Sequence, residues 1–162
     1  YAPLTQRQLK SDDLHPTTET QLWDAKTVKA LSPLDSNNRS TVLSLQYGQV
    51  SVLLTGDLEE PVEQALVAQG MVARHTILKV GHHGSKSSSS EAFLRVVQPE
   101  IALISVGEKN SYGHPSKEIL QRLRHYGAQS TLRTDELGTI ELVTDGQRVW
   151  QIPTATQKSL RP

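Results

Sequence analysis

The sequence predicts an α/β layered fold, in which a mixed β-sheet is covered by helices. Apolar runs typical of buried strands alternate with amphipathic helical segments between residues 75 and 133. Hairpin patterns flank this region on both sides, and glycine or proline marks the ends of most elements. Because strands that alternate with helices form sheets with helices packed against them, we expect one layered unit over residues 1–152. A chain of 162 residues is long enough to bury a core.

The first half of the chain predicts these elements in order: a strand over 27–31, a turn over 34–38, a hairpin formed by 39–47 and 49–55, and a helix over 59–69. The turn is rich in Asp, Ser and Asn. The hairpin is predicted because apolar and polar residues alternate on both sides of Gly48. The helix is predicted because Val62 and Leu66 have helical spacing, with Pro61 near its start and Gly70 at its end.

The second half predicts a regular alternation: strand 75–80, helix 90–97, strand 101–106, helix 115–126, strand 128–133, a turn over 135–138, and a hairpin across 145–146. Ser88 and Glu91 have the spacing of a capping box for the first of these helices. Pro115 is expected in the first turn of the second, and Gly127 lies just past its end. Residues 153–162 are expected to be a frayed tail.

Composition excludes several classes of protein. Positive and negative side chains balance at 17 each, so no bulk basic charge indicates nucleic-acid binding, although a local cluster would suffice. The absence of cysteine excludes disulfides, thiolate metal sites and a cysteine nucleophile. No apolar stretch approaches the roughly 20 residues needed to span a bilayer. The chain begins at Tyr1 rather than methionine, from which we expect it to be part of a longer protein.

A candidate metal site follows two neighbouring strands. Asp57 comes directly after one apolar run, and His82 and His83 come after the next, between two glycines. Carboxylate plus imidazole is a ligand mixture that zinc or manganese accepts. We therefore predict that Asp57 and His83 bind metal. Their side chains should lie within about 8 Å of each other, because ligand bonds are only about 2.0–2.2 Å long. His82 is predicted to be a neighbouring ligand or a catalytic contact to the substrate.

Structural roles stay open for these residues. Asp57 could cap the helix expected from residue 59, and the histidine pair could be a chance dipeptide. Adjacent side chains on an extended strand point in opposite directions, so at most one histidine of the pair is expected to bind metal directly. His15, His75 and His125 have no motif around them, and we interpret them as surface residues or as residues with satisfied hydrogen bonds.

A third segment carries His114, which we predict to be a catalytic contact to the substrate phosphate. Pro115 at the first helical position would leave His114 at or beside the N-cap, next to amides that favour anions. A solvent-exposed loop histidine is the alternative. Ser85 and Lys86 could present a hydroxyl and a cation to a phosphodiester, whereas Ser88–Ser90 indicates a flexible linker. No glycine-rich phosphate loop or dinucleotide fingerprint is present, so no nucleotide cofactor is expected.

Five motifs taken together resemble one known domain. They are Leu53–Asp57, Leu78–Lys86, Ile104–Gly107, Tyr112–Pro115 and Arg133–Gly138. Their order and spacing closely resemble the metallo-β-lactamase-like domain of ComEC-type DNA-internalisation competence proteins. The resemblance is strongest over residues 20–145, which is most of the chain.

The resemblance implies an αββα sandwich that carries a metal-dependent nuclease site with one or two zinc or manganese ions. Asp57 matches the bridging metal carboxylate, His82 and His83 match the later histidine motif, and His114 matches the histidine near the substrate phosphate. The implied activity is degradation of the DNA strand that is not imported. In that family the domain is a soluble, extracytoplasmic part of a cytoplasmic-membrane protein. Its implied partners are single-stranded DNA and the rest of the parent chain, including a membrane channel.

One motif of that family is absent from the chain. Members carry an earlier His-x-Asp-x-Asp-His-type motif that supplies most metal ligands, and no such segment occurs here. We therefore interpret the chain as the C-terminal half of the sandwich, with one apolar sheet face left without its partner layer. Two alternatives stay open: a stand-alone hydrolase of a small phosphoester such as phosphorylcholine, and a non-catalytic binding module.

Overall fold

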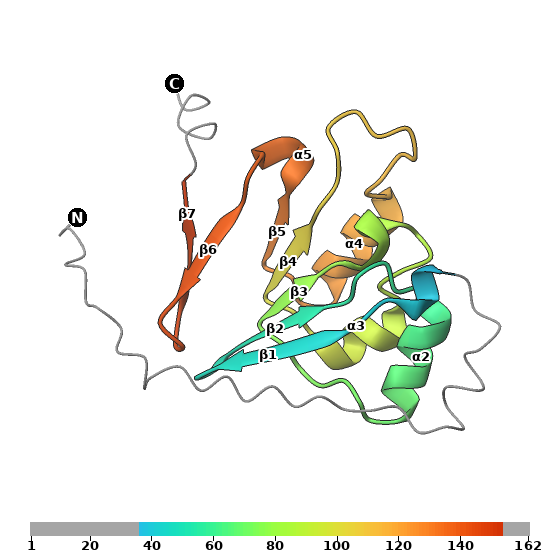
Figure 1. Ribbon diagram of the computed structural model, residues 1–162, viewed down its shortest axis with the longest axis horizontal. Helices are drawn as coiled ribbons and strands as arrows, with labels where there is room; N and C mark the ends of the chain where they lie inside the picture. Colours follow the sequence, from blue (N-terminus) through green and yellow to red (C-terminus); the bar gives the residue numbers. More distant parts are fainter. Residues whose placement is uncertain (1–35, 154–162) are drawn as a thin grey trace.

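The computed structural model describes residues 36–153, which form two β-sheets and several short helices (Figure 1). The elements follow in chain order as η2 (Asn37–Arg39), β1 (Leu43–Tyr47), β2 (Val50–Leu54), α2 (Glu60–Ala68), β3 (Ile77–Lys79), η3 (Gly81–Gly84), α3 (Glu91–Val97), β4 (Ile101–Ile104), α4 (Lys117–His125), β5 (Ser130–Arg133), α5 (Thr134–Leu137), β6 (Glu141–Thr144) and β7 (Val149–Ile152). The strand expected over 27–31 lies outside the described residues. The turn expected over 135–138 belongs to the short helix α5. Over the described range, no helix has the length and apolarity required to cross a bilayer.

The larger sheet is mixed, as the sequence predicts. Its five strands have the order β1-β2-β3-β4-β5. β1 and β2 pair antiparallel as the expected hairpin, and the other three pairings are parallel. Leu54 aligns with Lys79, and Lys79 aligns with Leu103, so β2, β3 and β4 end at one edge of the sheet. β6 and β7 form a separate antiparallel hairpin across Asp145, also as expected.

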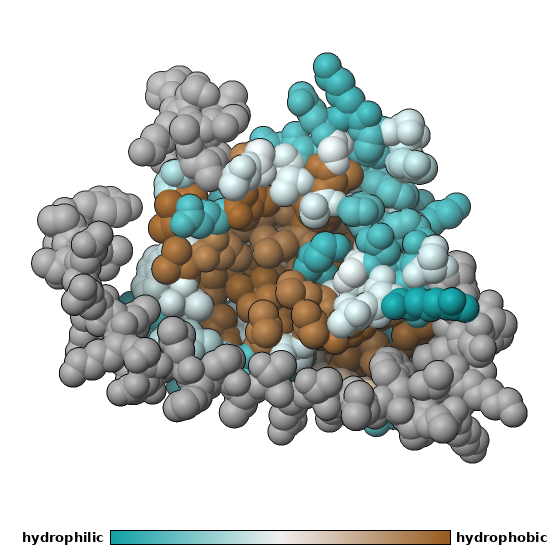
Figure 2. Space-filling model, viewed as in Figure 1, coloured by the Kyte–Doolittle hydropathy of each residue, from teal (hydrophilic) through white to brown (hydrophobic). Residues whose placement is uncertain are grey.

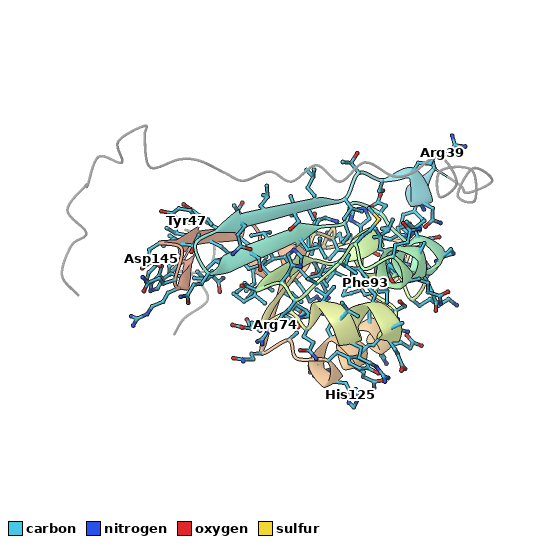
Figure 3. The ribbon with its side chains drawn as sticks, turned by 90° about the horizontal axis from the view of Figure 1, so that it is seen from below. Arg39, Tyr47, Arg74, Phe93, His125 and Asp145 are labelled. Atoms are coloured by element: carbon cyan, nitrogen blue, oxygen red, sulfur yellow. The ribbon has the colours of Figure 1, made fainter. Side chains whose placement is uncertain are left out.

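Helices α2, α3 and α4 lie on one face of this sheet, as the view turned by 90° shows (Figure 3). Alternate strand residues such as Leu53 and Leu78 point into the layer between sheet and helices, where Phe93 and Leu123 meet them. Full burial of one such side chain contributes about 1.5–3 kcal/mol. The core consists of Leu53, Leu58, Val62, Leu66, Val72, Leu78, Val80, Phe93, Leu94, Val97, Ala102, Ile104, Ile119, Leu123 and Ala128.

The opposite face of the sheet carries apolar side chains that remain exposed. On β1, Leu43 and Tyr47 are each 44% exposed, and Leu45 is 41% exposed. The space-filling view shows a broad apolar surface on this side of the molecule (Figure 2). These side chains give β1 an exposed apolar face, as predicted for this sheet, whereas the missing partner layer remains a prediction.

Two helix starts differ from those predicted. α3 begins after Ser90, whose hydroxyl accepts a hydrogen bond from the amide three residues on, so the cap expected at Ser88 is wrong. α4 begins after Ser116, whose hydroxyl does the same. Pro115 therefore precedes the helix, and the expected placement of His114 at the N-cap is also wrong. At α3 the Ser88 hydroxyl is instead bonded to the Gly81 and Ser85 carbonyls. At α4 the reason is that a serine hydroxyl is among the best acceptors for the free amides of a first turn.

The serine run Ser88–Ser90 is not a flexible linker, because all three residues are buried. The Glu63 carboxylate accepts the Ser89 amide at 2.5 Å and the Ser90 amide at 2.7 Å. From the other side, Arg122 Nη1 donates to the Ser88 and Ser89 carbonyls. Burial raises the pKa of Glu63 and outweighs the opposite effect of these amides. The prediction failed because small serines let the backbone pass between two helices, where charged side chains satisfy it.

Two adjacent serines provide a matched test of this packing. The Ser88 hydroxyl lies 2.8 Å from the Gly81 carbonyl and 2.9 Å from the Ser85 carbonyl. The Ser89 hydroxyl is buried without a hydrogen-bond partner. Ser88→Ala should therefore lower the free energy of unfolding by about 1–3 kcal/mol. Ser89→Ala should leave it unchanged or raise it. Urea denaturation of both variants measures the difference, and an equal loss in the two would contradict the hydrogen-bond assignment.

Candidate metal and phosphate site

Asp57 lies in the turn that follows β2, at the edge where the parallel strands end. Its amide donates to Ser40 Oγ over 2.9 Å. Gly56 has a left-handed φ of +56°, and a Cβ there would lie 2.8 Å from the Ser40 Cβ, so glycine is required in this turn. Helix α2 has Glu59 as its N-cap, without a side-chain cap. Asp57 is therefore not a helix cap, and its side chain is 41% exposed at the sheet edge.

The histidine pair lies in the tight turn Gly81–Gly84, directly after β3. His82 and His83 have left-handed φ values of 44° and 54°. Non-glycine residues rarely occupy this region, and those that do cluster at functional sites. A Cβ on either flanking glycine would lie 2.6 Å from another segment, at the Leu58 carbonyl or at the Pro115 Cβ. The two glycines thus let the strained turn pack closely against its neighbours.

His83 and Asp57 lie side by side. The His83 Nε2 atom is 3.6 Å from Asp57 Oδ1, so the predicted proximity of these two side chains is confirmed. His83 Nδ1 is 2.6 Å from the Ser105 carbonyl. Because a carbonyl only accepts, Nδ1 donates this bond, and in the neutral imidazole the lone pair is then on Nε2.

This pair of donors fits one metal ion. Two ligands of a tetrahedral ion with bonds of about 2.0–2.2 Å are separated by roughly 3.4 Å. The 3.6 Å distance between His83 Nε2 and Asp57 Oδ1 is close to that value. Across residues 36–153, however, no group of three or more candidate ligands converges on one point. A catalytic zinc normally needs three protein ligands, so Asp57 and His83 would not complete such a site by themselves.

His82 points toward a different partner. Its Nδ1 atom is 2.7 Å from Glu59 Oε1, and both side chains are mostly buried. The His82 ring centroid lies 6.4 Å from that of His83 and 5.8 Å from that of His114. The three imidazoles therefore gather at the same edge of the sheet, although they come from two loops.

His114 reaches this edge from the loop before α4. Asn110 holds its backbone at both ends, because the side chain accepts the His114 amide and donates to the His114 carbonyl. The Tyr112 ring stacks on the imidazole with centroids 5.9 Å apart. Partial burial lowers the pKa of His114, and the neighbouring His82 and His83 lower it further. The structure thus brings together Asp57, His82, His83 and His114.

Ser85 and Lys86 lie beside this cluster but differ in exposure. Lys86 is exposed, where a cation is accessible. Ser85 is buried, and its hydroxyl is bonded to that of Ser87 over 2.9 Å. Its amide donates to the His82 carbonyl. Ser85 therefore holds the turn together rather than presenting its hydroxyl at the surface.

Two residues near the cluster were not predicted. Lys79 Nζ donates to the Gly56 and Val80 carbonyls. Burial lowers the pKa of the Lys79 ammonium, and the Asp57 carboxylate opposes that shift. A lysine at the end of an apolar strand is a signal that could have indicated this contact. Glu59, the partner of His82, gave no such signal, because an acidic residue at a helix start is ordinary.

Comparison with known proteins agrees with this geometry. A profile of the Metallo-beta-lactamase superfamily matches residues 11–108, a range that includes Asp57, His82 and His83. The chain therefore belongs to the metallo-β-lactamase superfamily. His114 lies beyond the matched range.

Within this superfamily the chain is similar to competence proteins. It is 43% identical over 113 residues to ComE operon protein 3 of Bacillus subtilis (strain 168), and the matched region covers 70% of this chain and 14% of the relative. It is 38% identical over 125 residues to Competence protein ComA of Neisseria gonorrhoeae, covering 74% and 18%. It is also 38% identical over 109 residues to Recombination protein 2 of Haemophilus influenzae (strain ATCC 51907 / DSM 11121 / KW20 / Rd), covering 64% and 14%. The resemblance to competence proteins is thus confirmed, and the chain spans less than a fifth of each relative's length.

The contact between the two histidine loops can be tested with two glycines. Gly84 and Gly113 both have left-handed φ values, +80° and +71°. A Cβ at Gly84 would meet Pro115 at 2.6 Å, whereas one at Gly113 would meet nothing within 4 Å. Gly84→Ala should therefore cost about 1–3 kcal/mol more in free energy of unfolding than Gly113→Ala, because only Gly84 adds a clash. Chemical denaturation measures the difference, and equal costs would show that the loops do not touch.

Proposed function

We propose that the chain is the C-terminal part of a metal-dependent phosphodiesterase domain that cleaves DNA during uptake. The observation that carries this proposal is the placement of Asp57 and His83 at 3.6 Å, beside the rings of His82 and His114. A carboxylate and an unprotonated imidazole nitrogen are metal ligands, and the other two imidazoles can contact a substrate next to the metal.

Each residue has a distinct part in the proposed mechanism. Asp57 Oδ1 and His83 Nε2 would hold a zinc or manganese ion, together with ligands from outside the described residues. A metal bound there supplies acidity to water and offsets charge on the phosphate. His114, held by Asn110 and stacked on Tyr112, would donate a hydrogen bond to a phosphate oxygen. Lys86 adds an accessible cation for the backbone of the substrate.

The competence relatives support DNA as the substrate class. Two of these relatives are named as a competence protein and a recombination protein. The regions matched to them cover 74% and 64% of this chain. We infer that the parent protein lies in the cytoplasmic membrane, that this domain is extracytoplasmic, and that it degrades the strand that is not imported. Its partners would be that DNA strand and the remainder of the parent chain, including its channel; no nucleotide cofactor is needed.

A non-catalytic binding module is the second candidate. It is favoured by one observation, that fewer than three candidate ligands converge among the described residues. Such a module would keep the His82, His83 and His114 cluster without hydrolysing a substrate. The two candidates differ in whether the missing ligands are supplied by sequence outside the described residues.

The role of His114 can be separated from metal binding. In the full-length protein, His114→Ala should lower turnover of single-stranded DNA by about 100-fold or more, because a hydrogen-bond donor to the phosphate is lost. Metal content, measured by mass spectrometry of the purified protein, should equal that of the wild type. His125→Ala, which changes an exposed histidine at the C-terminal end of α4, is the control. Loss of metal in His114→Ala would instead make His114 a ligand.

The 162-residue chain alone is expected to lack useful hydrolytic activity. Two converging ligands should hold metal weakly and position water poorly. Incubation of the purified chain with manganese or zinc should therefore give no cleavage of single-stranded DNA above the metal-only control. Robust metal-dependent cleavage that Asp57→Ala abolishes would show that the chain contains a complete site.

A further inference from the structure

We infer that Glu59 is the positioning residue for His82, and that it sets which ring nitrogen of His82 faces the site. This inference deepens the proposed function and rests on it only for its effect on turnover. Glu59 is the N-cap residue of α2 and follows Asp57 by two positions in the sequence. No motif in the sequence marks it. Its carboxylate nevertheless makes the shortest polar contact of either His82 nitrogen among residues 36–153.

The contact is specific in geometry and partly shielded from water. Glu59 Oε1 lies 2.7 Å from His82 Nδ1 and 2.8 Å from Ser87 Oγ. The Glu59 and His82 side chains are 17% and 26% exposed. Because the carboxylate is a pure acceptor when ionised, the atom facing it on His82 is the protonated Nδ1. In the neutral imidazole, Nε2 then carries the lone pair on the opposite side of the ring.

Glu59 is itself held in place from two directions. Its amide donates to Asn38 Oδ1 over 3.1 Å, and Asn38 Nδ2 lies 3.4 Å from Glu59 Oε2. The next amide, that of Glu60, donates to the Ser87 carbonyl over 2.8 Å. Glu59 is the N-cap of α2, yet its side chain does not cap the helix. The carboxylate is therefore directed across to the histidine turn instead of to the helix amides.

The same arrangement recurs at His83, which strengthens the inference. There Nδ1 is bonded to the Ser105 carbonyl, and Nε2 faces Asp57. Both imidazoles thus have Nδ1 occupied by an acceptor of the protein and Nε2 left for a ligand or substrate. Acceptors of this kind fix ring orientation and tautomer around metal sites, and their removal costs about 10–100-fold in metal affinity or activity.

A purely structural role for Glu59 predicts a different result. In that case the carboxylate would only join α2 to the turn, and its loss would change stability without changing the proton on His82. The tautomer of His82 therefore distinguishes the two roles. Nitrogen-15 shifts and long-range couplings of the imidazole report that tautomer directly, in the metal-free chain and without any assay of activity.

The experiment uses the ¹⁵N-labelled 162-residue chain, with the His82 signals identified by their loss in His82→Gln. The wild type should show Nδ1–H at His82. Glu59→Gln, whose amide oxygen can still accept, should keep that tautomer. Glu59→Ala should shift the ring toward the Nε2–H form that imidazole prefers in water. Glu60→Ala, which removes a neighbouring carboxylate bonded to Gln64, is the matched control and should change nothing.

An unchanged Nδ1–H signal in folded Glu59→Ala would overturn the inference. Thermal unfolding establishes that each variant is folded, and if Glu59→Ala is not, Glu59→Leu keeps the volume of the side chain and carries the same test. In the gene-length protein, Glu59→Ala should lower kcat by about 10–100-fold with KM nearly unchanged, and Glu59→Gln should recover most of it. A wild type without nuclease activity, together with a tautomer that depends on Glu59, would refute the proposed function alone.

Discussion

The site depends on the parallel pairing of β2 with β3. The two strands are in register up to Leu54 and Lys79, so their following turns begin at the same edge of the sheet. The His82 amide then donates to the Gly56 carbonyl over 3.2 Å, which joins the two turns directly. Because neighbouring strands lie about 4.8 Å apart, side chains in the turns that follow them can come into direct contact. The 3.6 Å distance between Asp57 and His83 follows from this pairing.

A second set of contacts holds the histidine turn from behind. The buried Glu63 carboxylate and the Arg122 guanidinium satisfy the backbone of Ser88–Ser90, so the segment after the turn is fixed between α2 and α4. This anchoring explains how His82 and His83 can keep left-handed backbone angles, which cost of order 1–3 kcal/mol each and persist only where surrounding contacts enforce them. The site is thus supported by the same helices that cover the core.

The sequence predicted the parts that depend on local pattern. The mixed sheet, the hairpins and the proximity of Asp57 to His83 all follow from apolar runs and from the residues just after them. The burial of the serine run did not, because it depends on Glu63, whose partners lie 26 and 27 residues further along the chain. The positions of helix starts failed for a smaller reason: several serines and a proline were candidates for the cap, and the hydroxyls of Ser90 and Ser116 are the ones that accept a first-turn amide.

The acceptors that orient the two adjacent histidines differ in how they respond to mutation. His83 is bonded to the main-chain carbonyl of Ser105, and every amino acid carries that group. Substitution at position 105 therefore preserves the acceptor as long as β4 keeps its place. His82 is bonded to the side chain of Glu59, which one nucleotide change can remove. A single substitution at position 59 can therefore change the orientation and tautomer of His82 during evolution. The orientation of His83, in contrast, is kept as long as the fold is kept.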